Sequence, residues 1–376
     1  MGWILGAAAV AKLGLGALIA RRLTAPPGPR SFDLVIRVVE NEDGEIVVVL
    51  DRTRQTLAHG LYTLLFEGGG WAQLAEEAVE RGRDRVARRV TGLSTGLSPA
   101  IDDRVSWSGI FFVTPADAGL DAEEVRISTP AGAAPAWLIK GENPETWAIH
   151  IHGMGSPRSG PLRGARVAAD LGYTSLVVSY RNDGDGPWVG SRGSTLGAAE
   201  ADDVAAAVQY AVDQGAQRVV LFGWSMGAAI ALQLAADPRH SAYIRALVLE
   251  SPVLDWIETV KANCVRAGLP AAAGLLAVPW LALGPLARTI GLPGPVPLRA
   301  LNGIARAHEL ETPTLILHGT RDDSAPLNLA RTLAGIRADV VRLEQFDAGH
   351  TMTWNSDSER WQTVVSSWLT ARLPKA

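Results

Sequence analysis

The sequence predicts an α/β protein, with a mostly parallel β-sheet, helices on both faces of that sheet and a β-rich N-terminal extension. Two observations lead to this prediction. Of the 376 residues, 47% are hydrophobic and 20% are charged, which is enough to bury a sizeable core. From Thr146 onward, near-continuous apolar runs alternate with helical patterns, as expected of parallel strands that are covered on both faces.

The second half of the chain supplies the elements of this sheet. Strands are expected at residues 146–153, 174–180, 218–223, 244–251, 312–319 and 339–346. Helices are expected between or after them at residues 161–172, 196–215, 226–237, 324–336 and 358–373. In an open sheet of this kind the active site lies at the carboxyl ends of the strands.

One apolar segment, at about residues 256–308, interrupts the alternation. Its prolines, at positions 270, 279, 285, 293 and 295, break it too often for a membrane-spanning helix. We expect a helical lid inserted over the top of the sheet, which would give a substrate pocket an apolar wall. The catalytic domain with this lid is expected to span residues 141–376.

The N-terminal segment, residues 1–24, suggests a hydrophobic anchor helix. Residues 2–20 are apolar except for Lys12, which is roughly the length that a membrane-spanning helix needs. Arg21 and Arg22 follow directly, and the positive-inside rule would then hold the catalytic domain in the cytoplasm. The alternatives are a cleaved signal peptide on a secreted chain, or an amphipathic or oligomer-packing helix on a soluble one.

Residues 31–140 form the expected β-rich extension. The apolar runs at 32–40 and 45–50 flank the turn sequence "NEDG", which is typical of a hairpin. The charged stretch at 71–90 is expected to be partly helical, and further short strands are expected at 107–115, 123–129 and 134–140. This part contains no recognisable catalytic constellation, so we interpret it as structural.

Charge and cysteine content exclude several classes of partner and cofactor. The net charge is −4 and there is no run rich in Lys and Arg, so a nucleic-acid partner is not expected. The single cysteine, Cys264, cannot form an internal disulfide or a cysteine-based metal site.

The sequence Gly223-Trp224-Ser225-Met226-Gly227 matches G-x-S-x-G, between a predicted strand and a predicted helix. This is the context of a nucleophile elbow, a turn so sharp that glycines are needed on both sides of the serine. Ser225 is therefore the candidate nucleophile, and the helix that follows would favour a developing negative charge.

A serine hydroxyl needs a base, and His350 is the best-placed histidine because it follows the last predicted strand at the same sheet edge. The imidazole in turn needs a carboxylate, which Asp322 or Asp323 can supply from the loop after the preceding strand. Asp255 is a more distant candidate. The order Ser, Asp, His along the chain is that of an α/β-hydrolase triad.

The glycine-rich turn His152-Gly153-Met154-Gly155 follows another strand at this edge. We expect the backbone N–H groups of Met154 and Met226 to form the oxyanion hole. Side chains do not provide these hydrogen bonds, so the two methionines can also line the acyl pocket.

Over about residues 146–372, the motifs "HGMG", "GWSMG", "HGTRDDSAP" and "AGHT" occur in this order, and the chain resembles the α/β-hydrolase superfamily of serine hydrolases. The family pattern His-Gly-x-x-Asp, with a proline four residues later, fits His318 to Asp322 and Pro326, so the resemblance implies Asp322 as the acid. The segment "SYRNDGDGPW" resembles the esterase and peptidase-like branches. Ala228 stands where relatives often have a second glycine, and we expect little effect.

These features predict a carboxylic ester hydrolase that works through an acyl-enzyme and needs no metal or organic cofactor. The apolar insertion and N-terminal helix suggest a small-molecule ester with an apolar acyl group and a membrane-associated chain. Thioesterase, peptidase and acyltransferase activities use the same kind of site and stay open. The alternative from another class is a catalytically idle, membrane-associated binding protein with this fold.

Overall fold

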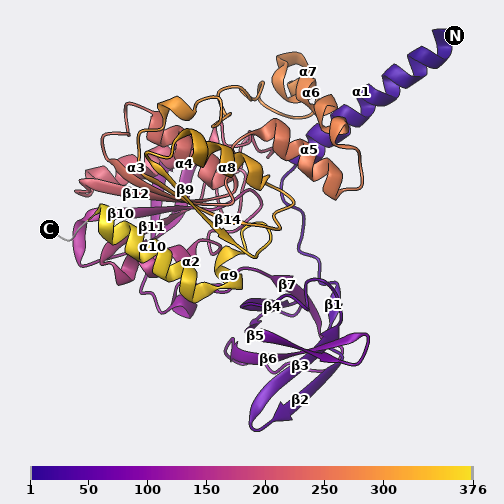
Figure 1. The fold of residues 1–376 in the computed structure, drawn as a ribbon, viewed down its shortest axis with the longest axis vertical. Helices are drawn as coiled ribbons and strands as arrows, with labels where there is room; N and C mark the ends of the chain where they lie inside the picture. Colours follow the sequence, from indigo (N-terminus) through magenta and orange to yellow (C-terminus); the bar gives the residue numbers. More distant parts are fainter. Residues whose placement is uncertain (1, 374–376) are drawn as a thin grey trace.

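A computed structural model describes residues 2–373, in which two β-sheets are preceded by one long helix (Figure 1). The expectations for residue 1 and for residues 374–376 lie outside this range. The larger sheet has eight strands in the order β15-β14-β13-β12-β10-β11-β9-β8. The smaller sheet has seven, in the order β1-β7-β4-β5-β6-β3-β2.

The eight-stranded sheet is mostly parallel, as predicted. Strands β10 to β15 pair in parallel, while β8 and β9 add an antiparallel edge next to β11. The strands are β8 (Glu123–Thr129), β9 (Gly132–Ile139), β10 (Asn143–Ile151), β11 (Tyr173–Val178), β12 (Arg218–Trp224), β13 (Ile244–Glu250), β14 (Thr314–Gly319) and β15 (Val341–Phe346). Because β8 and β9 belong to this sheet, the boundary expected at residues 140–141 falls inside it.

Helices cover both faces of this sheet because its strands are apolar on both sides. Along β12, for example, Leu221 faces one core and Phe222 the other. One face is covered by α3 (Glu200–Asp213), α4 (Met226–Ala236) and α8 (Leu327–Ile336), and the other by α2 (Leu162–Asp170) and α10 (Ser358–Arg372). A short helix, α9 (Thr353–Ser356), precedes α10.

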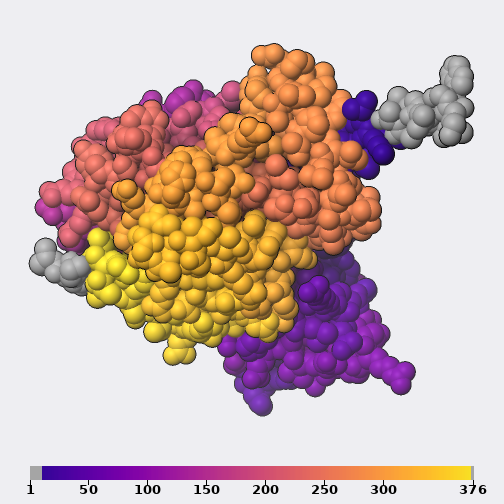
Figure 2. Space-filling model, turned by 45° about the horizontal axis from the view of Figure 1, so that its top comes forward, coloured from indigo at the N-terminus to yellow at the C-terminus, as the bar shows by residue number. Residues whose placement is uncertain are grey.

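The seven-stranded sheet is antiparallel throughout and packs against the C-terminal segment of the chain (Figure 2). Its strands are β1 (Leu34–Val35), β2 (Val38–Glu42), β3 (Glu45–Asp51), β4 (Tyr62–Phe66), β5 (Trp71–Arg81), β6 (Arg85–Leu93) and β7 (Arg104–Ser108). A short turn of 3-10 helix, η1 (Ala116–Ala118), follows it. The expected hairpin is confirmed: Asp43 and Gly44 join β2 to β3 with positive φ angles of 53° and 89°.

The expectation of a partly helical stretch at residues 71–90 is wrong, because these residues form the β5–β6 hairpin. Ala72 and Leu74 alternate with more polar neighbours and point into the sheet's own core, and Val86 is likewise fully buried. Burial on one face of a sheet has therefore outweighed the helix propensity of the Ala- and Glu-rich sequence.

The second half of the N-terminal helix α1 (Gly2–Thr24) packs against the helical insertion. Gly16 lies so close to the backbone carbonyl of Leu276 that a Cβ atom would collide with it, and Ala20 is fully buried. No helix in the described part of the chain combines the length and the hydropathy that a membrane crossing requires. The expected membrane-spanning anchor is therefore not supported by the described residues.

The insertion between β13 and β14 is helical, as expected. It contains α5 (Trp256–Arg266), η2 (Ala271–Ala277), α6 (Val278–Ala282), α7 (Gly284–Thr289) and η3 (Ala307–Glu309). Its apolar side chains, including Trp256, Val260 and Leu281, are buried in the same core cluster as Ala20 of α1. The apolar character of this segment is thus used for packing against α1 and the sheet.

Candidate active site

Ser225 occupies a strained turn between β12 and α4. Its φ and ψ angles are 52° and −111°, a conformation that residues other than glycine rarely adopt. The flanking glycines are needed for space: a Cβ atom on Gly223 would lie 2.6 Å from the Ala228 Cα, and one on Gly227 would collide with the Ile151 carbonyl. Ala228 fits without difficulty. The hydroxyl therefore projects from the carboxyl edge of the sheet, at the start of α4.

Three predicted residues from separate loops form one hydrogen-bonded chain. The Ser225 Oγ lies 2.9 Å from the His350 Nε2, and the His350 Nδ1 lies 2.8 Å from the Asp322 Oδ2. A carboxylate can only accept, so the Nδ1 atom carries the proton and the neutral ring accepts the serine O–H at Nε2. This tautomer leaves the imidazole ready to take the hydroxyl proton.

The carboxylate beside His350 is Asp322, and the two other candidate acids lie elsewhere. The Asp322 side chain is fully buried, whereas Asp323 is exposed. Asp255 instead caps α5, where its Oδ1 accepts a 2.7 Å hydrogen bond from the Ile257 backbone N–H. The choice of Asp322, which rested on family resemblance, stays a prediction, and Asp322 is the candidate acid that lies within hydrogen-bond distance of His350.

Several donors keep Asp322 ionised. Its Oδ1 accepts 2.9 Å hydrogen bonds from the backbone N–H groups of Ser324 and Ala325, and the His318 Nε2 lies 3.3 Å from its Oδ2. Burial raises the pKa of Asp322, but hydrogen bonds from His318 and His350 outweigh burial and hold it well below the ordinary value. In the sequence, His318 stands out only as the first residue of the family pattern, and the fold reveals its contact with the acid.

The turn expected to supply the oxyanion hole lies directly against the elbow. A Cβ atom on Gly153 would sit 3.3 Å from the Ser225 Cβ, and Met154 lines the cavity at the serine. Met226 is the first residue of α4, so its N–H has no acceptor within the helix. Its side chain does not line this cavity. The Met226 Sδ is buried and lies 3.6 Å from the Ser194 hydroxyl.

A buried pair, Tyr180 and Asp183, holds this turn in place. The Tyr180 hydroxyl donates to the His152 carbonyl over 2.9 Å, and the Asp183 Oδ2 accepts from the Gly155 N–H over 2.7 Å. The His152 ring stacks on Tyr180 with centroids 4.1 Å apart, and burial lowers its pKa. Tyr180 and Asp183 both belong to the segment "SYRNDGDGPW", which was noted for its family resemblance, but nothing in the sequence indicated which turn they support.

A cavity of about 280 Å³ opens beside Ser225. Its lining includes Ile110, Met154, Pro157, Pro161 and Met352, together with Ser225 and His350. No residue of the insertion at 256–308 lines this cavity. The expectation that a lid gives the substrate pocket an apolar wall is therefore wrong. Residues 107–110, which form the end of β7 and the turn after it, line the cavity instead.

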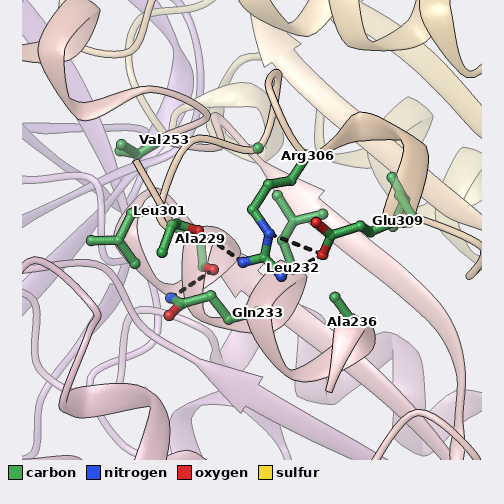
Figure 3. A pocket seen from close by; sticks show the side chains of 11 residues that line it. Ala229, Leu232, Gln233, Ala236, Val253, Leu301, Arg306 and Glu309 are labelled. Atoms are coloured by element: carbon green, nitrogen blue, oxygen red, sulfur yellow. Dashed lines mark hydrogen bonds and ion pairs between the residues drawn. The ribbon is translucent and has the colours of Figure 1, made fainter. Parts of the chain in front are cut away.

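A second small cavity lies away from this chemistry, between α4 and the segment before β14 (Figure 3). Its volume is about 40 Å³, too small for an ester substrate. It is closed by the ion pair between Arg306 and Glu309, and Gln233 donates to the Ala229 carbonyl at its edge. None of the candidate catalytic residues lines it.

Asn355 ties the loop after His350 to the antiparallel sheet. Its Nδ2 donates to the carbonyls of Leu61 and Gly109 over 2.6 and 2.9 Å, and its own carbonyl accepts from the Leu61 N–H over 2.9 Å. On the other side, its Oδ1 accepts from the Arg163 guanidinium over 2.9 Å. Asn355 is only 1% exposed, so one buried amide links both parts of the chain close to His350.

Arg163 continues this network toward the nucleophile. It lies 3.4 Å from the Glu250 Oε1, and the Glu250 Oε2 accepts from the Trp224 indole over 3.0 Å. Arg163 also donates to the Thr351 carbonyl over 2.9 Å. The residues before Ser225 and after His350 are thus fixed by one buried ion pair.

Replacing Asn355 by Ala should lower the stability of the protein by about 3 kcal/mol, because two carbonyls and a guanidinium N–H lose their buried partner. Urea unfolding followed by circular dichroism measures the change. Gln209→Ala is the matched control, since its amide bonds only to exposed Asp213, and it should cost less than about 0.5 kcal/mol. An unfolding midpoint for Asn355→Ala equal to that of the control would contradict this view of the network.

Among the described residues, no group of three or more His, Cys, Asp or Glu side chains is arranged to hold a metal ion.

The fold and this edge of the sheet define an α/β-hydrolase. The model of the alpha/beta hydrolase family matches residues 148–365, more than half of the chain, and the chain belongs to this family. A second model, of a domain of unknown function, DUF8805, matches residues 35–108 and so coincides with the antiparallel sheet. No curated protein sequence matches the chain.

Solved structures agree on the fold. The chain is similar to the esterase Pf2001 of Pyrococcus furiosus in space group P21, with a TM-score of 0.54 and 20% identity over 69% of this chain and 96% of the esterase. The same esterase in space group P212121 gives a TM-score of 0.54 and 21% identity over 69% and 94%. At this identity the likeness concerns the fold alone.

Proposed function

We propose that the chain is a serine hydrolase that cleaves carboxylic esters through an acyl-enzyme. The observation that carries this proposal is the chain of hydrogen bonds from Asp322 through His350 to Ser225, with heavy-atom distances of 2.8 and 2.9 Å. Membership of the alpha/beta hydrolase family and the strained elbow at Ser225 support it further.

In the first half of the reaction, the Ser225 Oγ attacks the ester carbonyl carbon while the His350 Nε2 takes its proton. The carbonyl oxygen becomes an oxyanion, which accepts hydrogen bonds from the N–H groups of Met154 and Met226. The C–O bond then breaks, His350 gives its proton to the departing alkoxide oxygen, and the alcohol leaves. Asp322 stabilises the imidazolium that exists between these two transfers.

In the second half, water takes the place of the alcohol. His350 removes a proton from the water as its oxygen attacks the acyl carbon, and the second oxyanion occupies the same pair of backbone donors. Collapse breaks the bond to the Ser225 Oγ, which recovers the proton from His350. The products are the acid and the free enzyme, and this proposal needs no metal or organic cofactor.

The acyl group is proposed to be apolar. Ile110, Met154, Pro157 and Met352 line the cavity next to Ser225, which would remove apolar surface of the acyl chain from water. A panel of p-nitrophenyl esters from short to long acyl chains measures the preferred length. Its optimum should lie at acyl chains that a space of about 280 Å³ accommodates.

A fluorophosphonate probe tests the proposed function directly. The wild-type chain should be labelled at Ser225, because the probe reacts with a hydroxyl activated by a neighbouring base. Ser225→Ala should not be labelled, while Ser324→Ala, which removes another loop hydroxyl near the acid, should be labelled like the wild type. If the folded wild-type chain remained unlabelled, the chain would be an idle binding protein and the proposal would be wrong.

A further inference from the structure

We propose that the antiparallel sheet of residues 34–108 is a substrate-binding element. It would form, together with the loop that carries His350, a site for the alcohol portion of the ester. The structure assigns to this site an uncharged alcohol with several hydroxyl groups, such as a sugar or another polyol. This inference rests on the proposed ester hydrolysis and names the substrate class for it.

A large cavity separates the two parts of the chain at this point. Its volume is about 760 Å³, and Leu57, Tyr62 and Trp107 line it on the side of the antiparallel sheet. Phe346 and His350 line it on the side of the eight-stranded sheet. The space is large enough for an alcohol the size of a monosaccharide or larger.

This larger cavity, called the alcohol cavity here, shares lining residues with the smaller cavity at Ser225, called the acyl cavity. Both are lined by Trp107, His350 and Met352, whereas Ser225 and Met154 line only the smaller one. The leaving oxygen must receive a proton from the His350 Nε2, so the alcohol lies on the histidine side of the ester. The acyl group then occupies the smaller cavity, and the alcohol extends into the larger.

The sheet presents an aromatic surface to the alcohol cavity. The rings of Tyr62 and Trp107 lie with centroids 4.7 Å apart, and the Arg88 guanidinium lies 5.4 Å from the Trp107 ring. Arg88 is fully buried and donates to the carbonyls of Ala58 and Gly60 over 2.7 and 2.8 Å. It therefore fixes the loop before β4 as well as the rings, which gives a rigid wall for the flat apolar face of a ring-shaped alcohol.

The polar groups of the alcohol cavity favour hydroxyls over a net charge. Its lining includes three arginines and three aspartates, so their formal charges cancel: Arg54, Arg321, Arg360, Asp323, Asp347 and Asp357. Arg321 pairs with Asp347 over 3.1 Å, and Arg360 pairs with Glu344 over 3.0 Å. The cavity therefore has no excess of charge that would attract an anionic or a cationic alcohol. It does offer hydrogen-bond donors and acceptors to the hydroxyl groups of a neutral alcohol, including those of Gln55 and His59.

The experiment compares three acetates, which share one acyl group, on the full chain. These are 6-O-acetylglucose, cyclohexylmethyl acetate as an apolar alcohol of similar size, and vinyl acetate, whose leaving group is too small to fill the alcohol cavity. The wild type should hydrolyse 6-O-acetylglucose with a kcat/KM about tenfold or more above that for cyclohexylmethyl acetate.

The variants Gln55→Ala and Arg54→Ala then test the polar lining of the alcohol cavity. Each should lower kcat/KM for 6-O-acetylglucose about tenfold, mainly through KM, and change that for vinyl acetate by less than about threefold. Both residues are exposed and line only the alcohol cavity, so their replacement does not endanger folding. Trp71→Ala removes a half-buried tryptophan of the same sheet that lines neither cavity, and it should leave both substrates unaffected.

Three outcomes would overturn the inference. A wild-type preference for cyclohexylmethyl acetate, or an equal loss on both 6-O-acetylglucose and vinyl acetate in the Arg54 and Gln55 variants, would rule out the alcohol site while leaving ester hydrolysis standing. Absence of any turnover of vinyl acetate, together with absence of fluorophosphonate labelling, would overturn both proposals at once.

Discussion

Asp322→Asn is expected to lower kcat for a p-nitrophenyl ester about 10⁴-fold, whereas Asp323→Asn should leave it within about twofold. The two residues are neighbours and the substitutions are identical, so the comparison isolates position. Only Asp322 accepts the 2.8 Å hydrogen bond from the His350 Nδ1. An amide there can donate its own N–H to Nδ1. The imidazole then carries its proton on Nε2, so Nε2 can no longer accept the serine proton and the base is lost.

The pH profile gives this prediction a second readout. Because its neighbours hold the pKa of Asp322 well below the ordinary value, its carboxyl stays ionised wherever the wild type is assayed. Protonation of this acid should therefore leave no step in the wild-type profile above about pH 4. Equal losses for Asp322→Asn and Asp323→Asn, with both variants folded, would show that the acid has been assigned incorrectly.

Ser225→Ala is expected to lower kcat by about 10⁵- to 10⁶-fold, which leaves only the rate that the oxyanion donors and substrate binding sustain. The further replacement of His350 by Ala in the same chain should cost almost nothing more. The reason is that the imidazole acts on the substrate only through the hydroxyl 2.9 Å away during acylation. Active-site groups that act as a unit are strongly non-additive in this way.

A double-mutant cycle measures this coupling from the rates of wild type, Ser225→Ala, His350→Ala and the double variant. Thermal unfolding of each variant controls for folding. Losses that multiply in the double variant would mean that Ser225 and His350 act separately.

The sequence was informative where local geometry dictates residue type. The sharp turn at Ser225 requires glycines on both sides, and this steric need is visible in five letters of sequence. His350 followed from the alternation of strands and helices, because the carboxyl ends of parallel strands meet at one edge. Choosing Asp322 over Asp323 required the family pattern, since neither spacing nor composition separates adjacent aspartates.

The parts that could not be predicted depend on contacts between distant segments. Asn355 bonds to Leu61 and Gly109, which lie 294 and 246 residues away along the chain. No local signal marks such a residue. The prediction that the insertion at 256–308 lines the substrate pocket failed for a related reason. Its apolar residues indicate that they are buried, but not whether a substrate or α1 covers them. At residues 71–90, strand pairing decided between two conformations that the local sequence allows.

The amide of Asn355 has a dynamic consequence. Hydrogen exchange reports the cooperative units in which a native protein opens, and a unit ends where few buried bonds cross its boundary. Here bonds to the Leu61 and Gly109 carbonyls cross from one sheet to the segment next to His350. Fluctuations that loosen β4 are therefore expected to loosen the segment after His350 as well, so protection factors in the two segments should rise and fall together.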